Sequence, residues 1–194
     1  MACSKEQRED EISQLCGRLL EYTVGTYETF HDAREGEMEG CRLNISIFGM
    51  TGSGKSALIN TIFKSLDSKS EHMATTQDAG KEGTKMLDSY AVPKTQITLF
   101  DTPGFFELDR TEEGELFRIL FGIEQPGEYL TRGSTGAQKA DAAGVAAYRL
   151  KKPPIVDQMH VILWVIKAVD IRFQMGQYRE KIKFVQDQLK QASE

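Results

Sequence analysis

Cysteine is scarce in this chain of 194 residues. Its three cysteines, Cys3, Cys16 and Cys41, are odd in number and widely spaced. That pattern excludes a disulfide scaffold and a cysteine-rich zinc site, and it is typical of a reducing compartment. The three histidines are also far apart in the sequence, so we expect no metal site built on histidine.

Long apolar stretches and targeting signals are missing as well. The longest apolar run, Val161–Val169, is too short to span a bilayer and contains Lys167. The first residues are too charged for a secretory signal. Neither end carries a lipidation motif. These absences predict a cytoplasmic protein without a transmembrane segment.

An excess of positive charge is lacking too. Lysine and arginine number 24 against 29 aspartates and glutamates, which gives a net charge of −5. A broad nucleic-acid surface would require the opposite balance, so we expect no nucleic-acid partner. The chain is 40% hydrophobic and 27% charged, which is ordinary for a globular domain with a core.

Residues 1–40 are predicted to form a helix and a polar connector. From Ser4 to about Tyr22, apolar residues recur at helical spacing, and their stripe consists of Ile12, Leu15, Cys16, Leu19 and Leu20. The favoured interpretation is that the stripe packs on the flank of the following domain. The alternative is a helix that binds a partner.

Residues 41–194 are predicted to form an α/β domain. Hydrophobic patterns indicate strands and helices in alternation, with one short turn at Pro93-Lys94 that makes the two strands around it antiparallel. We expect a three-layer sandwich, with helices on both faces of a mostly parallel sheet containing one antiparallel strand. The predicted elements are strand Leu43–Phe48, helix Ser56–Lys64, strands Met86–Val92 and Gln96–Phe100, helix Glu112–Ile123, strand Met159–Val165 and helix Tyr178–Gln191.

A phosphate-binding motif follows the first strand of this domain. The residues Gly49–Ser56 (GMTGSGKS) match G-x-x-x-x-G-K-[ST] in full, between a strand and a helix whose apolar face includes Ala57. Glycines let the backbone fold tightly around phosphate oxygens, and the main-chain N–H groups then point inward at the anion. Lys55 is placed to reach the β- and γ-phosphates, and the Ser56 hydroxyl is a Mg²⁺ ligand.

A second motif, Asp101-Thr102-Pro103-Gly104, ends the Gln96–Phe100 strand. An aspartate at this place holds Mg²⁺, usually through a water molecule. Gly104 has no side chain, so its N–H can approach the γ-phosphate. The alternative is a simple turn, because Asp, Pro and Gly all favour turns.

A third element is a threonine in the polar stretch before the second strand. A nucleotide switch contacts Mg²⁺ and the γ-phosphate there and releases them after hydrolysis. We favour Thr84 over Thr75 and Thr76 because it directly precedes the strand. Lys55 and Thr84 are the expected catalytic residues, and Ser56, Thr84 and Asp101 are the expected metal ligands. The expected nucleotide-binding residues are Gly49, Thr51, Gly52, Ser53, Gly54, Lys55, Ser56, Ala57, Asp101 and Gly104.

This layout, IFGMTGSGKSALINTIF followed by DTPGF and MHVILWVIKAVD, resembles the TRAFAC-type GTPases. It is similar, more narrowly, to the interferon-induced protein 44-like GTPases. That similarity includes the Thr84–Tyr90 run, the FRILFGI helix, the GEYL segment at Gly127–Leu130 and the PP-I-x-D-x-M-H entry to the last strand. The resemblance implies GTP or GDP as ligand, Mg²⁺ as cofactor and a role in innate immune or antiviral responses.

Two departures from the GTPase pattern stand out. The guanine-reading motif [NT]-K-x-D is missing, and Ile166–Asp170 has K-x-x-D spacing instead. Phe105 stands where Ras-like GTPases place a glutamine that orients the attacking water. We therefore expect slow hydrolysis, or hydrolysis that borrows a group from a partner. A P-loop ATPase or kinase and a nucleotide-binding interaction module without hydrolysis remain alternatives.

The related folds order their strands 2-3-1-4-5-6, and this chain ends at Glu194, after the helix that follows the fourth strand. We therefore expect a Ras-like G domain without its last strands. The strand Met159–Val165 would then be an apolar edge, which favours pairing with a second copy or a partner. Homodimerisation or another self-association is expected.

Overall fold

The protein folds around one sheet of four strands. The computed structural model describes residues 5–25, 35–36, 38–66, 74, 86–105, 110–128 and 153–191. The strands lie in the order β2-β3-β1-β4 and comprise β1 (Leu43–Gly49), β2 (Asp88–Ala91), β3 (Ile97–Asp101) and β4 (Val161–Val165). β1 is parallel to β3 and β4, and β2 is antiparallel to β3. The predicted strand order and mixed sheet are confirmed.

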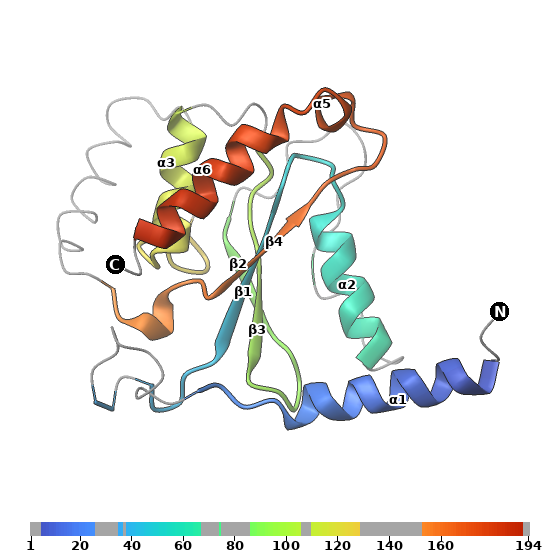
Figure 1. Ribbon diagram of the computed structural model, residues 1–194. Helices are drawn as coiled ribbons and strands as arrows, with labels where there is room; N and C mark the ends of the chain where they lie inside the picture. The colour runs from blue at the N-terminus through green and yellow to red at the C-terminus, as the bar shows by residue number, and fades with distance from the viewer. Residues whose placement is uncertain are drawn as a thin grey trace.

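Helices cover both faces of this sheet (Figure 1). The helix α2 (Lys55–Leu66) lies on one face, and α3 (Arg110–Leu120) and α6 (Tyr178–Gln191) lie on the other. Ile59 and Phe63 of α2 are buried, whereas Ala57 is exposed, so its predicted place on the apolar face is wrong. The three-layer architecture is confirmed, and no helix among the described residues is long and apolar enough to cross a membrane.

The alternation of β1 divides the core into two hydrophobic clusters. Ile47 packs with Ile59 and Phe63 of α2. Its neighbour Phe48 packs on the opposite face with residues of α3 and α6, including Leu116. Successive strand residues point to opposite faces, so this buried central strand is apolar on both sides, as parallel strands usually are.

The edge strand β4 is covered less completely on the side of α2 than on the side of α3 and α6, although Val165 packs against the cluster on the α2 side. Trp164 packs beside Phe48 on the side of α3 and α6. Val161 and Leu163 point to the other face and are 37% and 38% exposed. The apolar edge strand expected from the sequence is therefore present among the described residues, and part of its apolar surface is exposed. β4 therefore has more apolar side chains than the described core buries.

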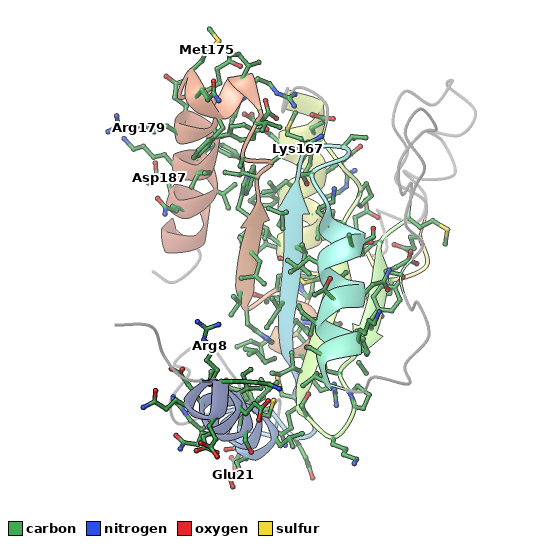
Figure 2. The ribbon with its side chains drawn as sticks, turned by 90° about the vertical axis from the view of Figure 1, so that its right-hand side faces the viewer. Arg8, Glu21, Lys167, Met175, Arg179 and Asp187 are labelled. Carbon is green, nitrogen blue, oxygen red and sulfur yellow. The ribbon has the colours of Figure 1, made fainter. Side chains whose placement is uncertain are left out.

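The N-terminal helix α1 (Lys5–Glu21) differs from the favoured interpretation. It has no buried residue, and Ile12, Leu15 and Leu20 are 60%, 54% and 47% exposed. Of the predicted stripe, Leu19 packs against the cluster on the α2 side. Figure 2 shows α1, marked by Arg8 and Glu21, at the end of the sheet opposite to Met175. The stripe therefore faces solvent for most of its length.

A short helix, α5 (Ile171–Gln174), and the 3₁₀ turn η2 (Ile155–Asp157) escaped the sequence patterns. Asp170, the aspartate of the K-x-x-D sequence, caps α5 by accepting a hydrogen bond from the Arg172 backbone N–H (2.9 Å). Its carboxylate also accepts from the Arg172 guanidinium and the Tyr178 hydroxyl (both 2.7 Å). These hydrogen bonds, that from the Arg172 side chain foremost, hold the pKa of Asp170 well below its usual range. This aspartate is thus engaged in capping.

Candidate nucleotide-binding site

The predicted phosphate-binding loop joins β1 to α2 at the carboxyl end of the parallel strands (Figure 1). The backbone turns sharply after β1, with φ of +75° at Gly52 and +103° at Gly54. Both values lie in the region that favours glycine. The Ser53 N–H donates to the Met50 carbonyl (3.1 Å), and the Leu58 N–H donates to the Gly54 carbonyl (2.9 Å) as α2 begins. The sequence thus produces the strand, loop and helix that its motif requires.

Lys55 is folded back over this loop. Its side chain donates from Nζ to the carbonyl oxygens of Gly49 (3.3 Å) and Met50 (3.4 Å). The residue is only 7% exposed. A buried ammonium is stable only where oxygen atoms surround it. Its position therefore concentrates one positive charge inside the loop, at the place where the sequence motif puts the phosphates.

The side chains of Ser56 and Asp101 are in direct contact. The Ser56 hydroxyl donates to Asp101 Oδ2 (2.5 Å). Asp101 is 1% exposed. Burial raises the pKa of its carboxyl group, and the charge of Asp88 raises it further, whereas the Ser56 hydrogen bond and the Lys55 charge lower it. A carboxylate and a hydroxyl side by side supply the hard oxygen ligands that Mg²⁺ prefers. These two residues fit the predicted ion.

Three buried polar atoms of this site have no hydrogen-bond partner within the described parts of the chain. They are Thr51 Oγ1, Ser53 Oγ and Asp101 Oδ1. Leaving such a group unpaired costs about 1–3 kcal/mol. Two hydroxyls that can donate to an anion, and one carboxylate oxygen that can coordinate a cation or accept a hydrogen bond from water, match a Mg²⁺-polyphosphate ligand. We regard this as the clearest structural sign of a binding site.

The turn after β3 is docked directly on the loop. A Cβ atom added to Gly104 would lie 2.5 Å from Thr51 Cα and 2.8 Å from Thr51 N. Beyond it, the Thr51 N–H donates to the Phe105 carbonyl (2.8 Å), and the Phe105 N–H donates to the Gly49 carbonyl (3.2 Å). Gly104 is therefore required for close approach of the two backbones.

Phe105 is part of the core and faces away from the site. It is 1% exposed. Its ring stacks on Phe48 (centroids 5.7 Å apart) and on Trp164 (6.4 Å). Its side chain is thus unable to orient a water molecule at a phosphate, in line with the sequence expectation. Instead, it fixes the turn after β3 to β1 and β4.

Other predicted residues differ in how far the structure describes them. Thr84, and the alternatives Thr75 and Thr76, lie outside the described residues. Ala57 lies in the first turn of α2, where its carbonyl accepts from the Thr61 hydroxyl (2.8 Å). The structure therefore brings together the predicted residues of the loop, Asp101 and Gly104, and leaves the threonine prediction as it stands.

Sequence reasoning missed three residues beside the site. Asp88 is the register partner of Asp101 across β2 and β3. Burial, followed by the charges of Asp88 and Asp101, raises the pKa of Tyr90 to about 12. The Thr102 hydroxyl donates to the Ile47 carbonyl (2.7 Å) and ties β3 to β1. The sequence did contain a signal for the position of Asp88. The short turn at Pro93-Lys94 makes β2 and β3 antiparallel, and this pairing places Asp88 opposite Asp101.

Several known proteins resemble part of this chain. Small ribosomal subunit biogenesis GTPase RsgA of Ralstonia pickettii (strain 12J) is 35% identical over 108 residues, which are 53% of this chain and 34% of that protein. Translocase of chloroplast 90 of Arabidopsis thaliana is 34% identical over 100 residues, 48% of the chain and 12% of that protein. Septin-9 of Homo sapiens is 35% identical over 78 residues, 37% of the chain and 13% of that protein. The chain thus covers a minor part of each.

A family comparison covers more of the chain. Residues 44–193 match the family described as 50S ribosome-binding GTPase. The matched range begins within β1 and ends after α6, so it contains the loop, the turn after β3 and all four strands. The chain therefore belongs to this family of P-loop GTPases.

Proposed function

We propose that the chain is a Mg²⁺-dependent guanine-nucleotide switch that hydrolyses GTP slowly. The observation that carries this proposal is a trio of buried oxygens around the loop that holds Lys55, which find no partner among the described residues: Thr51 Oγ1, Ser53 Oγ and Asp101 Oδ1. Family membership is the reason to propose a guanine nucleotide, since relatives of this chain are GTPases by name.

Each residue of the site has a distinct part in this function. The main-chain N–H groups of the loop and the Lys55 ammonium bind the phosphates. Ser56 and Asp101 hold Mg²⁺, which, when bound, neutralises charge that develops on the phosphate oxygens. Gly104 brings its backbone to the γ-phosphate side of the loop. We further propose Thr84 as the ligand that senses the γ-phosphate.

The slow rate follows from Phe105. Because this ring is stacked in the core, the residue after Gly104 offers no side chain to orient the attacking water. We expect turnover on the order of 10⁻³ s⁻¹ or below, as in GTPases that act without a helper arginine. The same observation favours a second candidate, a nucleotide-binding interaction module that does not hydrolyse.

Titration calorimetry with GTP, GDP, ATP and ADP in Mg²⁺ tests the proposal. We expect binding of GTP and GDP and at least tenfold weaker binding of the adenine nucleotides. A preference for ATP would make the chain a P-loop ATPase and contradict the guanine assignment. Phosphate release, followed at low and high protein concentration, separates a slow GTPase from the module that only binds.

We also propose that β4 is an interface for self-association. In the described part of the chain, β4 pairs with β1 and with no other strand. Val161 and Leu163 add exposed apolar surface to this edge. Unpaired strand edges with apolar side chains favour pairing with another chain.

Light scattering across a concentration series tests this interface. The wild-type chain is expected to dimerise as its concentration rises, and the double substitution Val161→Lys with Leu163→Lys is expected to keep it monomeric. Val169→Lys is the control, because Val169 is 75% exposed and lies beyond the end of β4. A wild-type chain that stays monomeric at the highest concentration contradicts the proposal.

The narrower resemblance supports a biological proposal. We propose residues 41–194 as the G domain, with residues 1–40 as a separate helical extension, of a cytoplasmic protein similar to the interferon-induced protein 44-like GTPases. A role in innate immune responses follows from that similarity. Interferon treatment of cells that encode this chain should then raise its messenger RNA, and an unchanged level would contradict the role.

A further inference from the structure

Two carboxylates face each other across the sheet beside the phosphate-binding loop. Asp88 of β2 and Asp101 of β3 are register partners in an antiparallel pair. Directly opposite residues of such a pair have their side chains on the same face, with Cβ atoms roughly 4.5–5.5 Å apart. Burial raises the pKa of Asp101, and the charge of Asp88 raises it further. The two acidic groups are therefore close enough to repel each other.

Contacts with α2 identify the face on which this pair lies. Asp101 accepts a hydrogen bond from Ser56 in the first turn of α2. Tyr90 follows Asp88 by two residues and lies on the same side of β2. Its ring meets that of Phe63 of α2 edge to face, with centroids 6.5 Å apart. Both carboxylates thus lie on the side of the sheet that carries the proposed magnesium ligands.

The pair is short of positive charge. Within the described residues, neither carboxylate forms an ion pair with a lysine or arginine, although the charge of Lys55 acts on Asp101. Asp101 is 1% exposed and its Oδ1 has no hydrogen-bond partner in the same part of the chain, whereas Asp88 is partly buried. Like charges directly opposite each other destabilise a sheet. A divalent cation held by Asp101 would turn this repulsion into attraction.

We propose that Asp88 is a positioning residue of the magnesium site, a second carboxylate that attracts the ion by its charge and accepts hydrogen bonds from its waters. Mg²⁺ keeps several waters in protein sites, and groups around a metal's direct ligands commonly set its affinity. The inference rests on the proposed function, because the ion is the one that Ser56 and Asp101 are proposed to hold.

The proposal predicts when Asp88 contributes to nucleotide binding. With Mg²⁺ present, its carboxylate strengthens binding through the ion. Without Mg²⁺, a negative charge at this place offers nothing to a polyphosphate. Loss of the Asp88 charge should therefore weaken nucleotide binding only when Mg²⁺ is present, whereas damage to the fold of the site would weaken binding in both conditions.

Four substitutions test this dependence on the ion. Asp88→Asn and Asp88→Ser both remove the charge, so either can carry the test if the other folds poorly, and Asp88→Glu keeps a carboxylate. Asp187→Asn is the matched control, because Asp187 is exposed on α6, away from α2, and loses the same unit of charge (Figure 2). The dissociation constant of GDP is measured by calorimetry for wild type and each variant, once in excess Mg²⁺ and once in EDTA.

The expected result is a loss confined to Mg²⁺. Asp88→Asn and Asp88→Ser should bind GDP roughly tenfold more weakly than wild type in Mg²⁺, and within twofold of wild type in EDTA. Asp88→Glu should recover most of the loss, and Asp187→Asn should match wild type in both conditions.

Other outcomes separate this inference from the proposed function. Equal weakening with and without Mg²⁺, unchanged binding in both neutral Asp88 variants, or an equal loss in Asp187→Asn overturns the inference and leaves the proposed function intact. A wild-type chain that binds no GDP, or that binds it equally well in Mg²⁺ and in EDTA, overturns both.

Discussion

Lys55→Ala is expected to weaken Mg²⁺-GTP binding about 100-fold or more, which corresponds to about 2.7 kcal/mol. The Lys55 ammonium is 7% exposed and lies against the carbonyl oxygens of Gly49 and Met50. In that buried place its hydrogen bonds to phosphate oxygens would be charge-assisted and poorly screened by solvent. Alanine offers the phosphates neither a charge nor a donor.

The fold should survive this substitution. Removal of the ammonium also removes the cost of burying its charge, which offsets the loss of its two carbonyl contacts. We expect the melting temperature without ligand to stay within a few degrees of wild type. Lys64→Ala is the control, because Lys64 is an exposed residue in the last turn of the same helix. If calorimetry found full affinity in Lys55→Ala, the phosphate assignment would be wrong.

Gly104→Ala is expected to lower both the free energy of unfolding and the affinity for nucleotide. The new Cβ would lie within 2.5–2.8 Å of backbone atoms of Thr51, and backbone cannot swing aside as a long side chain can. The turn would have to lift from the loop, which breaks the two hydrogen bonds of Phe105 to Gly49 and Thr51. Overpacking of this kind costs about 1–3 kcal/mol, or roughly 3–10 °C in melting temperature for a domain of this size.

Gly114→Ala, by contrast, is expected to stabilise the protein. Gly114 lies inside α3, and a Cβ there would meet nothing within 4 Å. Because alanine favours helix more than glycine does, we expect a gain of about 0.5–1 kcal/mol. Thermal unfolding of both variants, followed by circular dichroism, measures the contrast. Equal melting temperatures for the two variants would show that the turn is not docked on the loop as described.

Much of the fold could be predicted because its signals are local. Short apolar runs marked β1, which ends at Gly49, and β4, and apolar residues at helical spacing marked α2 and α6. The short turn at Pro93-Lys94 determined that β2 and β3 are antiparallel. Boundaries shifted by a few residues, as for β2, which begins at Asp88 instead of Met86. That shift is typical of elements whose ends depend on neighbouring strands.

The differences concern how much of an apolar face is covered. The stripe of α1 and the outer side of β4 have the patterns of buried elements, yet Ile12 is 60% exposed and Leu163 is 38% exposed. A pattern identifies a face that is suited to burial. It does not identify the surface that covers that face, because this depends on segments far away in the sequence.

The candidate site shows the same division. The loop and the turn after β3 are contiguous motifs, so their residues were assigned from sequence alone. The contacts between them were not, because Gly104 meets Thr51 across 53 positions of the chain. The two hydrogen bonds of the Asn60 amide to the backbone of Ala74, 14 residues later, were likewise hidden in an ordinary helical sequence.

The aromatic stack between β1, β4 and the turn after β3 has one practical consequence. Trp164 is the only tryptophan of the chain, and its indole lies face to face with Phe105. Ultraviolet excitation at the long-wavelength edge of aromatic absorption, where indole absorbs and phenol hardly does, would therefore address a single chromophore. The protein carries an intrinsic optical reporter beside the turn that follows Asp101, the aspartate proposed to bind Mg²⁺, so kinetics there can be recorded without attaching any dye.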